Sequence, residues 1–215
     1  MNNFSSKKPV IVIGGGGHAS VIVDMLKQQK RDIAAIISPD DTSARKTFQG
    51  MDILKKDEDV LRFNQDEVVL INGVGVLPGS NSRAKLNNYF KRLGYTFEIL
   101  VADTAYVSPY AVLHEGVQVF PGATIQPGVV IHAHTVVNTR AIIEHDVKLG
   151  ECNFVAPGAI VCGQCSTDVN VFIGAGATVI QNIELGAGAM VMANALVTEN
   201  ILPHQKVYAA RAIIR

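Results

Sequence analysis

An aliphatic residue recurs at every sixth position from Val107 to Val197, and Thr167 is the single exception among the sixteen positions. The residue four places after each aliphatic position is mostly small. The residue three places after it is Gly, Asn or Asp at eleven of the sixteen positions, and these residue types tolerate positive φ best. A short fixed period is typical of a solenoid. The pattern predicts alternating strands and tight corners, with three hexads in each 18-residue coil and coils about 4.8 Å apart.

The chain before this repeat has a different pattern. Apolar runs predict parallel strands at residues 10–13, 33–37 and 68–71, with a closing strand at 95–100. Amphipathic spacing predicts helices at 20–29 and 83–93. Because strands and helices alternate, we expect a small α/β unit with a Rossmann-like parallel sheet at residues 1–103. The all-β repeat then occupies residues 104–215, without any looped-out arm.

Composition narrows the classes of partner. The chain has 215 residues, a formal net charge of zero and 48% hydrophobic residues, which is enough to build two small domains. It has no basic block, so we expect no nucleic-acid partner. The first apolar strand is only four residues long, too short for a membrane span, so we expect no membrane insertion and a cytoplasmic location. Cys152, Cys162 and Cys165 are interpreted as buried free thiols rather than a redox or zinc pair.

A glycine-rich turn follows the first strand. The segment Gly14-x-Gly16-x-x-Ala19 matches a dinucleotide fingerprint, with Asp40 and Asp41 near the position of a ribose-binding acid. Glycines let backbone N–H groups approach a phosphate at a helix N-terminus. Four strands form only half of a classical dinucleotide fold, which favours a nucleoside diphosphate over NAD. A glycine-rich turn without a ligand is the alternative.

The chain as a whole resembles the hexapeptide-repeat sugar acetyltransferases, which include UDP-N-acetylbacillosamine N-acetyltransferases and sialic acid O-acetyltransferases. The resemblance rests on the order strand, Gly-Gly-Gly-His, helix, a strand ending in Asn-Gly-Val-Gly, and an uninterrupted repeat containing Ile143-Glu-His-Asp146. It implies a left-handed parallel β-helix and a homotrimer with active sites between subunits. It also implies acetyl-CoA as co-substrate, a UDP-amino-sugar on the N-terminal unit, and no metal.

The resemblance places the catalytic pair at His145 and Asp146. A neutral imidazole can take the proton that leaves an amine during acetyl transfer, and a carboxylate on its other nitrogen would hold the tautomer. Asp146 also stands at a corner that favours Gly, Asn or Asp, and His145 stands at an outward position, so a purely structural pair is the alternative. Gly163 lies 18 residues after His145 and is expected to leave open space for a thioester. Because the cysteines have no basic partner in the pattern, we expect direct transfer without a covalent enzyme intermediate.

The resemblance also implies binding residues. For the sugar nucleotide these are Gly16, Gly17, His18, Ser38, Pro39 and Gly75. For acetyl-CoA they are Phe154, Gly163, Ala175 and Ala193. Ser38 and Pro39 depart from the acidic residues common in the family, where Asp40 would compensate. Phe154 replaces a histidine that contacts the acetyl group in some members, which leaves the length of the acyl chain open. Arg211 or Arg215 would contact the CoA phosphates.

Three alternatives stay open at the level of the sequence. The acceptor could be a hydroxyl, as in sialic acid O-acetylation, instead of the amine of a UDP-linked 4-amino-4,6-dideoxy sugar. His114 and His132 are 18 residues apart, and His134 follows one corner later. These histidines are compatible with a zinc hydratase of the γ-type carbonic anhydrase class, which shares the prism. A trimeric scaffold that binds nucleotide without turnover is the third alternative.

Overall fold

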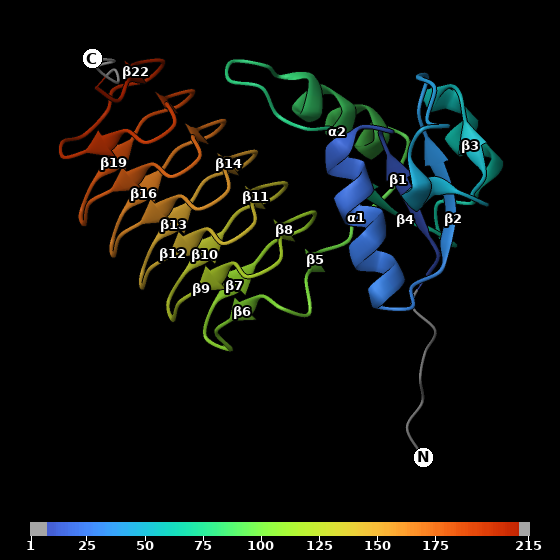
Figure 1. The fold of residues 1–215 in the computed structure, drawn as a ribbon, viewed down its shortest axis with the longest axis horizontal. Coiled ribbons are helices and arrows are strands. Elements are labelled where there is room, and N and C mark those ends of the chain that lie inside the picture. Colours follow the sequence, from blue (N-terminus) through green and yellow to red (C-terminus); the bar gives the residue numbers. More distant parts are fainter. Residues whose placement is uncertain (1–7, 211–215) are drawn as a thin grey trace. The chain divides into compact units, whose positions relative to one another are not determined.

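The computed structural model describes residues 8–210 and divides into two compact units (Figure 1). One unit contains the described residues up to 76 together with residues 82–98. The other contains residues 77–81 and the described residues from 99 onward.

The N-terminal unit is built on a four-stranded parallel sheet with the order β3-β2-β1-β4. Its strands are β1 (Val10–Ile13), β2 (Ile33–Ile37), β3 (Ile53–Leu54) and β4 (Val69–Asn72). All four residues of β1 are buried, as expected for a parallel strand covered on both faces. The chain runs from β1 outward to β2 and β3 and then returns to place β4 on the other side of β1. The strand order therefore reverses between β1 and β4, and ligands of open α/β sheets bind at such a reversal.

Two α-helices and two 3₁₀ helices complete this unit. They are α1 (Gly17–Gln28), η1 (Lys46–Phe48), η2 (Asp57–Arg62) and α2 (Ser82–Arg92). Helix α1 buries Ala19, Ile22, Val23, Met25 and Leu26, a spacing of three to four residues that forms one apolar face. The predicted helices are confirmed, but α1 begins three residues earlier than expected because the last residues of the glycine turn form its first turn.

The second unit is a prism with three parallel sheets, each named here by its first strand. The β5 sheet contains β5 (Leu100–Val101), β8 (Gln118–Val119), β11 (Val136–Val137), β14 (Phe154–Val155), β17 (Phe172–Ile173), β20 (Met190–Val191) and β22 (Lys206–Val207). The β6 sheet contains β6 (Tyr106–Val107), β9 (Thr124–Ile125), β12 (Ile142–Ile143), β15 (Ile160–Val161), β18 (Thr178–Val179) and β21 (Leu196–Val197). The β7 sheet contains β7 (Val112–Leu113), β10 (Val130–Ile131), β13 (Lys148–Leu149), β16 (Ser166–Thr167) and β19 (Glu184–Leu185).

The strands stack coil upon coil (Figure 1), and paired residues such as Ile142 and Ile160 are 18 positions apart. The second residue of nearly every two-residue strand points inward, and these aliphatic side chains form one continuous core. The left-handed parallel β-helix expected from the sequence is confirmed.

The corners confirm the predicted backbone conformation. Every sixth residue from Gly116 to Asn194 has φ between 56° and 76°. His134, Arg140, Cys152 and Gln164 adopt this conformation although they are not Gly, Asn or Asp. Asn200 does not adopt it, because the last coil is two residues shorter than the others and pairs Leu185 with Ile201.

A buried polar network explains Thr167, the one position that is not aliphatic. Its Oγ1 accepts a hydrogen bond from the backbone N–H of Gly150 at 2.9 Å and another from the side-chain amide of Asn153. Asn153 in turn accepts from the N–H of Val171, and its own N–H donates to Thr135 Oγ1. Gly150 N–H therefore bonds to a side chain instead of a strand carbonyl, and an aliphatic residue at position 167 would offer it no acceptor.

The segment 95–100 was predicted wrongly as one strand of the N-terminal sheet. Phe97 makes only an isolated bridge to Leu70 in that sheet, and Leu100 already belongs to β5 of the prism. The apolar run is therefore shared between the two units. The short strand β3 and both 3₁₀ helices had no counterpart among the predicted elements.

Candidate active site

The glycine turn after β1 is held tightly against its surroundings. Gly14 has a φ of 100°, which favours glycine. A Cβ on Gly15 would overlap the side chains of Ser38 and Thr42. The Gly15 carbonyl accepts a hydrogen bond from Arg45 Nε at 2.9 Å, a contact that the sequence did not suggest. The turn is therefore fixed, and it needs glycine for close packing as well as for backbone freedom.

The next two glycines face open space. Gly16 is the N-cap of α1, no side chain caps this helix, and Gly17 is its first residue. A Cβ on either glycine would meet nothing within 4 Å. The first N–H groups of a helix have no partner within the helix, and its N-terminus carries a partial positive charge. Because Gly16 and Gly17 are exposed and carry no side chains, this turn can receive an anionic group such as a phosphate.

A pocket of about 380 Å³ lies at the carboxyl ends of the four strands of the N-terminal unit. Its lining includes every residue predicted to bind the sugar nucleotide: Gly16, Gly17, His18, Ser38, Pro39 and Gly75. The turn after β4 comes close to the glycine turn, since a Cβ on Gly73 would lie 2.7 Å from Ala19 Cβ. The turn is braced by Asn72, whose Oδ1 accepts the N–H of Val74. The structure thus brings the predicted binding residues together in one cavity.

The acidic residues near this pocket have different roles. Asp41 does not line it. Its carboxylate accepts hydrogen bonds from the N–H and the hydroxyl of Ser43, and these bonds lower its pKa. Asp40 lines the pocket and is exposed. Asp57 also lines it, is half-buried, and has its pKa raised, mainly by burial and also by Glu58. Sequence reasoning missed Asp57, because it follows the two-residue strand β3, which is too short to show a periodic pattern.

His145 and Asp146 form a pair on the corner that joins β12 to β13. His145 Nδ1 and Asp146 Oδ2 are 2.9 Å apart, and each side chain is 59% exposed. An ionised carboxylate can only accept a hydrogen bond, so Nδ1 carries a proton, and in the neutral ring Nε2 then keeps its lone pair. The pair therefore has the tautomer required of a base at Nε2.

Glycines flank this pair in the neighbouring coils. A Cβ on Gly163 would lie 2.7 Å from both Cε1 and Nε2 of His145, and a Cβ on Gly128 would overlap Asp146 Oδ1. The expectation that Gly163 leaves open space for a thioester is thus corrected. The imidazole itself occupies the space above Gly163.

The structure does not gather the other predicted acetyl-CoA residues around His145 within one chain. Ala175 and Ala193 lie on the corner between the β5 and β6 sheets, whereas His145 lies on the corner between the β6 and β7 sheets. Phe154 points outward from the β5 sheet, is 7% exposed, and stacks on Phe172 with ring centroids 5.7 Å apart. Arg211 and Arg215, predicted to contact CoA phosphates, lie outside the described residues.

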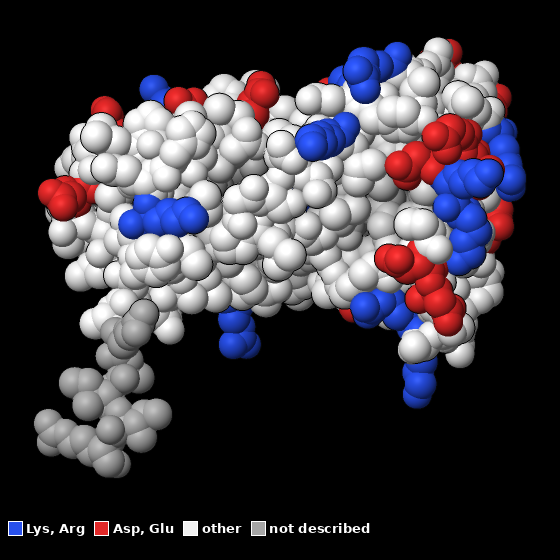
Figure 2. Space-filling model, turned by 90° about the horizontal axis from the view of Figure 1, so that it is seen from above, with Lys and Arg blue, Asp and Glu red and all other residues white. Residues whose placement is uncertain are grey.

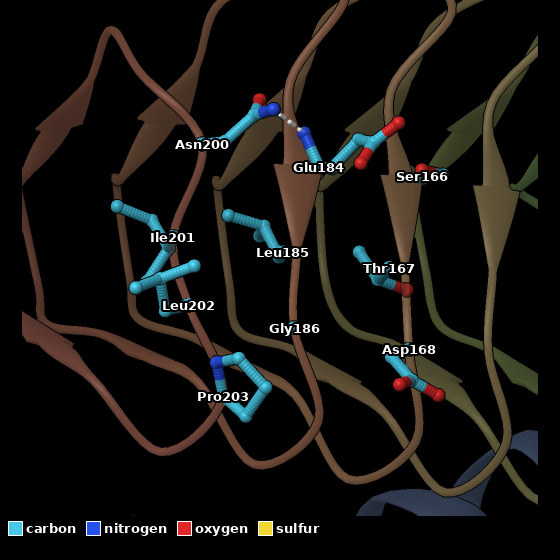
Figure 3. A pocket seen from close by; sticks show the side chains of 10 residues that line it. All are labelled: Ser166, Thr167, Asp168, Glu184, Leu185, Gly186, Asn200, Ile201, Leu202 and Pro203. Carbon is cyan, nitrogen blue, oxygen red and sulfur yellow. Dashed lines mark hydrogen bonds between the residues drawn. The ribbon is translucent and has the colours of Figure 1, made fainter.

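Two hollows lie on the prism itself. One of about 520 Å³ is lined by Ala193 together with Met192, Tyr208, Ala209 and Ala210. The other, of about 410 Å³, lies on the β7 sheet near its last coil (Figure 3). It contains the carboxylates of Asp168 and Glu184, and the side chain of Asn200 accepts the N–H of Glu184. No histidine or cysteine lines this second hollow, so it offers no counterpart of the His145 and Asp146 pair.

The remaining histidines and the cysteines were candidates for metal binding. His114 and His132 are stacked as expected, with ring centroids 4.9 Å apart. Across residues 8–210, no three His, Cys, Asp or Glu side chains are grouped so that they could hold a metal ion. All three cysteines are free thiols. Cys165 is buried, and burial raises its pKa, but Cys152 and Cys162 are half-buried rather than buried as predicted.

No described helix is both long enough and apolar enough to cross a membrane.

Comparison with known proteins gives consistent results for both units. Residues 9–89 match the family model of the PglD N-terminal domain. A variant of perosamine N-acetyltransferase from Caulobacter crescentus, solved with CoA and GDP-perosamine, is 26% identical with a TM-score of 0.84, over 94% of this chain and 97% of that chain. PerB from the same organism, also with CoA and GDP-perosamine, is 28% identical with a TM-score of 0.81, over 91% of each chain.

The acetyltransferase domain of PglB from Neisseria gonorrhoeae, solved with acetyl coenzyme A, shares the fold. It is 24% identical with a TM-score of 0.83, over 93% of this chain and 95% of that chain.

Proposed function

This chain is a member of the hexapeptide-repeat sugar acetyltransferase family and an acetyl-CoA-dependent acyltransferase of amino sugars, and we propose that its acceptor is the amine of a UDP-linked 4-amino-4,6-dideoxy sugar. The observation that carries the proposal is the His145 and Asp146 pair, with Nε2 available as a base. The glycine pocket of the N-terminal unit supports a nucleotide-linked acceptor. The solved relatives that bind a nucleotide amino sugar and CoA support the same reaction class.

In the proposed complex, the sugar nucleotide lies at the carboxyl ends of β1, β2 and β4. The uncovered N–H groups at the start of α1 bind the diphosphate, and Ser38 and Pro39 border the nucleoside. Gly75 and His18 border the side of the pocket next to β4. Acetyl-CoA binds along the prism, where Gly163, Ala175, Ala193 and Phe154 are the proposed contacts.

The proposed chemistry is direct transfer. The amine nitrogen attacks the thioester carbonyl carbon, a C–N bond forms, and the C–S bond breaks as the tetrahedral intermediate collapses. His145 Nε2 takes the proton from the amine and returns it to the departing sulfur, so that the products are the N-acetylated sugar and CoA with a free thiol. Asp146 holds Nδ1–H and stabilises the imidazolium that forms in between.

We propose that the active unit is a homotrimer with sites between subunits. The outward residues along the β6 sheet carry no charge: Tyr106, Thr124, Ile142, Ile160, Thr178 and Leu196. Figure 2, which looks from above and not onto the β6 sheet, shows fewer charged side chains over the prism than over the N-terminal unit. A second copy packed against this sheet would bring its own corner residues near His145.

The acceptor is tested by CoA thiol release from acetyl-CoA with UDP- and GDP-linked 4-amino-4,6-dideoxy sugars and with free sialic acid. Turnover of a UDP-linked amino sugar is expected. Turnover of sialic acid alone would overturn the proposal that the acceptor group is an amine. We propose a cytoplasmic location for the enzyme.

Replacing the proposed base gives the decisive variant. His145→Ala should reduce turnover by about 10²–10⁴-fold, while His114→Ala, on another strand end of the prism, should keep it. Full activity of His145→Ala would remove the base from the proposal.

A further inference from the structure

The carboxylate of Asp57 is half-buried in the nucleotide pocket, yet it makes no hydrogen bond to any residue that the structure describes. Burial raises its pKa, and the neighbouring Glu58 raises it further. A carboxylate that has lost part of its hydration without gaining a donor is destabilised. A ligand N–H in the pocket would supply that donor.

A second group in the same pocket lacks a partner. Ser38 is fully buried, and its Oγ has no hydrogen-bond partner among the residues described. Buried hydroxyls are nearly always paired. The glycine turn lies directly against this hydroxyl, since a Cβ on Gly15 would overlap it. Both residues line the same cavity, but the Ser38 hydroxyl is fully buried against the turn, so Asp57 is the group that a ligand can reach.

The order of the strands decides which part of a nucleotide reaches Asp57. The turn that can hold phosphate follows β1, Ser38 follows β2, and Asp57 follows β3 at the edge of the sheet. Strands lie about 4.8 Å apart, so the end of β3 is about 10 Å from the end of β1. In a nucleoside diphosphate the ribose separates the base from the phosphates. The base therefore extends past Ser38 toward Asp57, and the amino sugar extends the other way, toward β4.

The other two acids near the pocket are less suited to this contact. The Asp41 carboxylate is already occupied by the N–H and the hydroxyl of Ser43. Asp40 is exposed, so water competes for its carboxylate, and its backbone carbonyl accepts Lys55 Nζ. Of the three, only Asp57 is partly shielded from water within the pocket.

We infer that Asp57 reads the nucleobase of the sugar nucleotide by accepting its ring N–H. This inference rests on the proposed function only in so far as the pocket binds a nucleoside diphosphate. An ionised carboxylate accepts hydrogen bonds and donates none. Uracil presents N3–H and guanine presents N1–H at the corresponding edge, whereas adenine and cytosine present a ring nitrogen with a lone pair. The pocket therefore selects uridine or guanosine diphosphates and rejects adenosine and cytidine diphosphates.

The test is calorimetric titration of the full-length protein with UDP, GDP, ADP and CDP, without acetyl-CoA. UDP or GDP should bind, and the one that binds tighter identifies the base. Asp57→Asn should weaken that binding about tenfold or more, because a neutral amide oxygen replaces the charged acceptor and forms a weaker hydrogen bond. The Asn amide can donate to cytosine N3, so the variant should also bind CDP more tightly than the wild type does. If Asp57 had only a structural role, Asp57→Asn would not bind CDP more tightly than the wild type does.

Glu58→Gln is the matched control, because Glu58 is the adjacent carboxylate on η2, is exposed, and does not line the pocket. It should bind all four nucleotides as the wild type does. If the wild type and Asp57→Asn bound the preferred nucleotide, UDP or GDP, equally tightly, the inference would be overturned. The proposed acetyl transfer would not be affected by that result. Tight binding of ADP or CDP to the wild type would also overturn it. A wild type that binds no nucleoside diphosphate would overturn the nucleotide-linked acceptor itself, and with it the inference.

Discussion

At the scale of single residues, the position of the proposed base depends on an absent side chain. The His145 ring lies against the Cα of Gly163 in the next coil, where a Cβ would be 2.7 Å from Nε2. The equivalent corner position in other hexads holds alanine, as at Ala133, Ala187 and Ala193. The backbone therefore tolerates alanine at this type of corner. What excludes a larger residue at position 163 is the imidazole.

Gly163→Ala should lower kcat by about 10–100-fold, because it pushes the imidazole from its place and a displacement of about 1 Å is enough for such a loss. Steady-state kinetics with both substrates provides the measurement. A rise in KM for acetyl-CoA with unchanged kcat would indicate that Gly163 only lines the cofactor path.

The double variant separates these roles. In a His145→Ala background, Gly163→Ala should have no further effect on kcat, because the ring that it displaces is gone. An additional loss of the same size in that background would show that Gly163 acts independently of His145.

At the scale of elements, Thr167 shows why an aliphatic core position of the repeat can be polar. Its hydroxyl accepts bonds from Gly150 N–H and from the Asn153 amide, both inside the prism. A valine would fit the repeat better and would leave both donors buried without a partner. Leaving one such donor unpaired costs about 1–3 kcal/mol.

Thr167→Val should therefore destabilise the prism by about 1–3 kcal/mol, although it completes the aliphatic series. Chemical denaturation monitored by circular dichroism provides the measurement. Thr104→Val, at an exposed turn position of the prism, is the matched control and should change the free energy of unfolding little. A Thr167→Val variant as stable as the wild type would mean that the network contributes nothing.

At the scale of the whole molecule, the uncharged column on the β6 sheet is the proposed contact between copies. Ile160→Lys places an ammonium group in the middle of this column, where burial of an unpaired charge is costly. The variant should have the mass of a monomer by light scattering and should lose turnover, because the proposed site needs a second copy. Val112→Lys, on the exposed surface of the β7 sheet, should keep the mass of the trimer and the turnover of the wild type. A trimeric Ile160→Lys variant would exclude this face as the interface.

Much of the architecture could be predicted because it is local and repetitive. A strand of two residues followed by a corner is encoded within six positions, so the inward residues, the corners with positive φ and the stacking of His114 on His132 follow from counting. The glycine turn was predictable for the same reason, since strand, turn and helix are adjacent in sequence. The cavity residues Gly16, Ser38 and Gly75 were named from the resemblance to the family, and they meet in one cavity because parallel strands end at one edge of the sheet.

Other features depend on contacts between distant positions. Asp57 enters the pocket only because the two-residue strand β3 pairs with β2. The division of residues 95–100 between the two units depends on partners far along the chain, Leu70 and Gln118. A run of apolar residues has the same appearance whichever sheet it joins.

By itself, the sequence determined the period of the prism, the order of the two units and the pairing of His145 with Asp146, because these arise from residues that are neighbours in the chain or exact multiples of the period apart. Only the tertiary structure decided that the imidazole fills the space over Gly163, that Thr167 serves buried donors, and that Ser38 and Asp57 share one cavity without partners. These depend on the directions of side chains and on burial, which the spacing of residues along the chain does not specify.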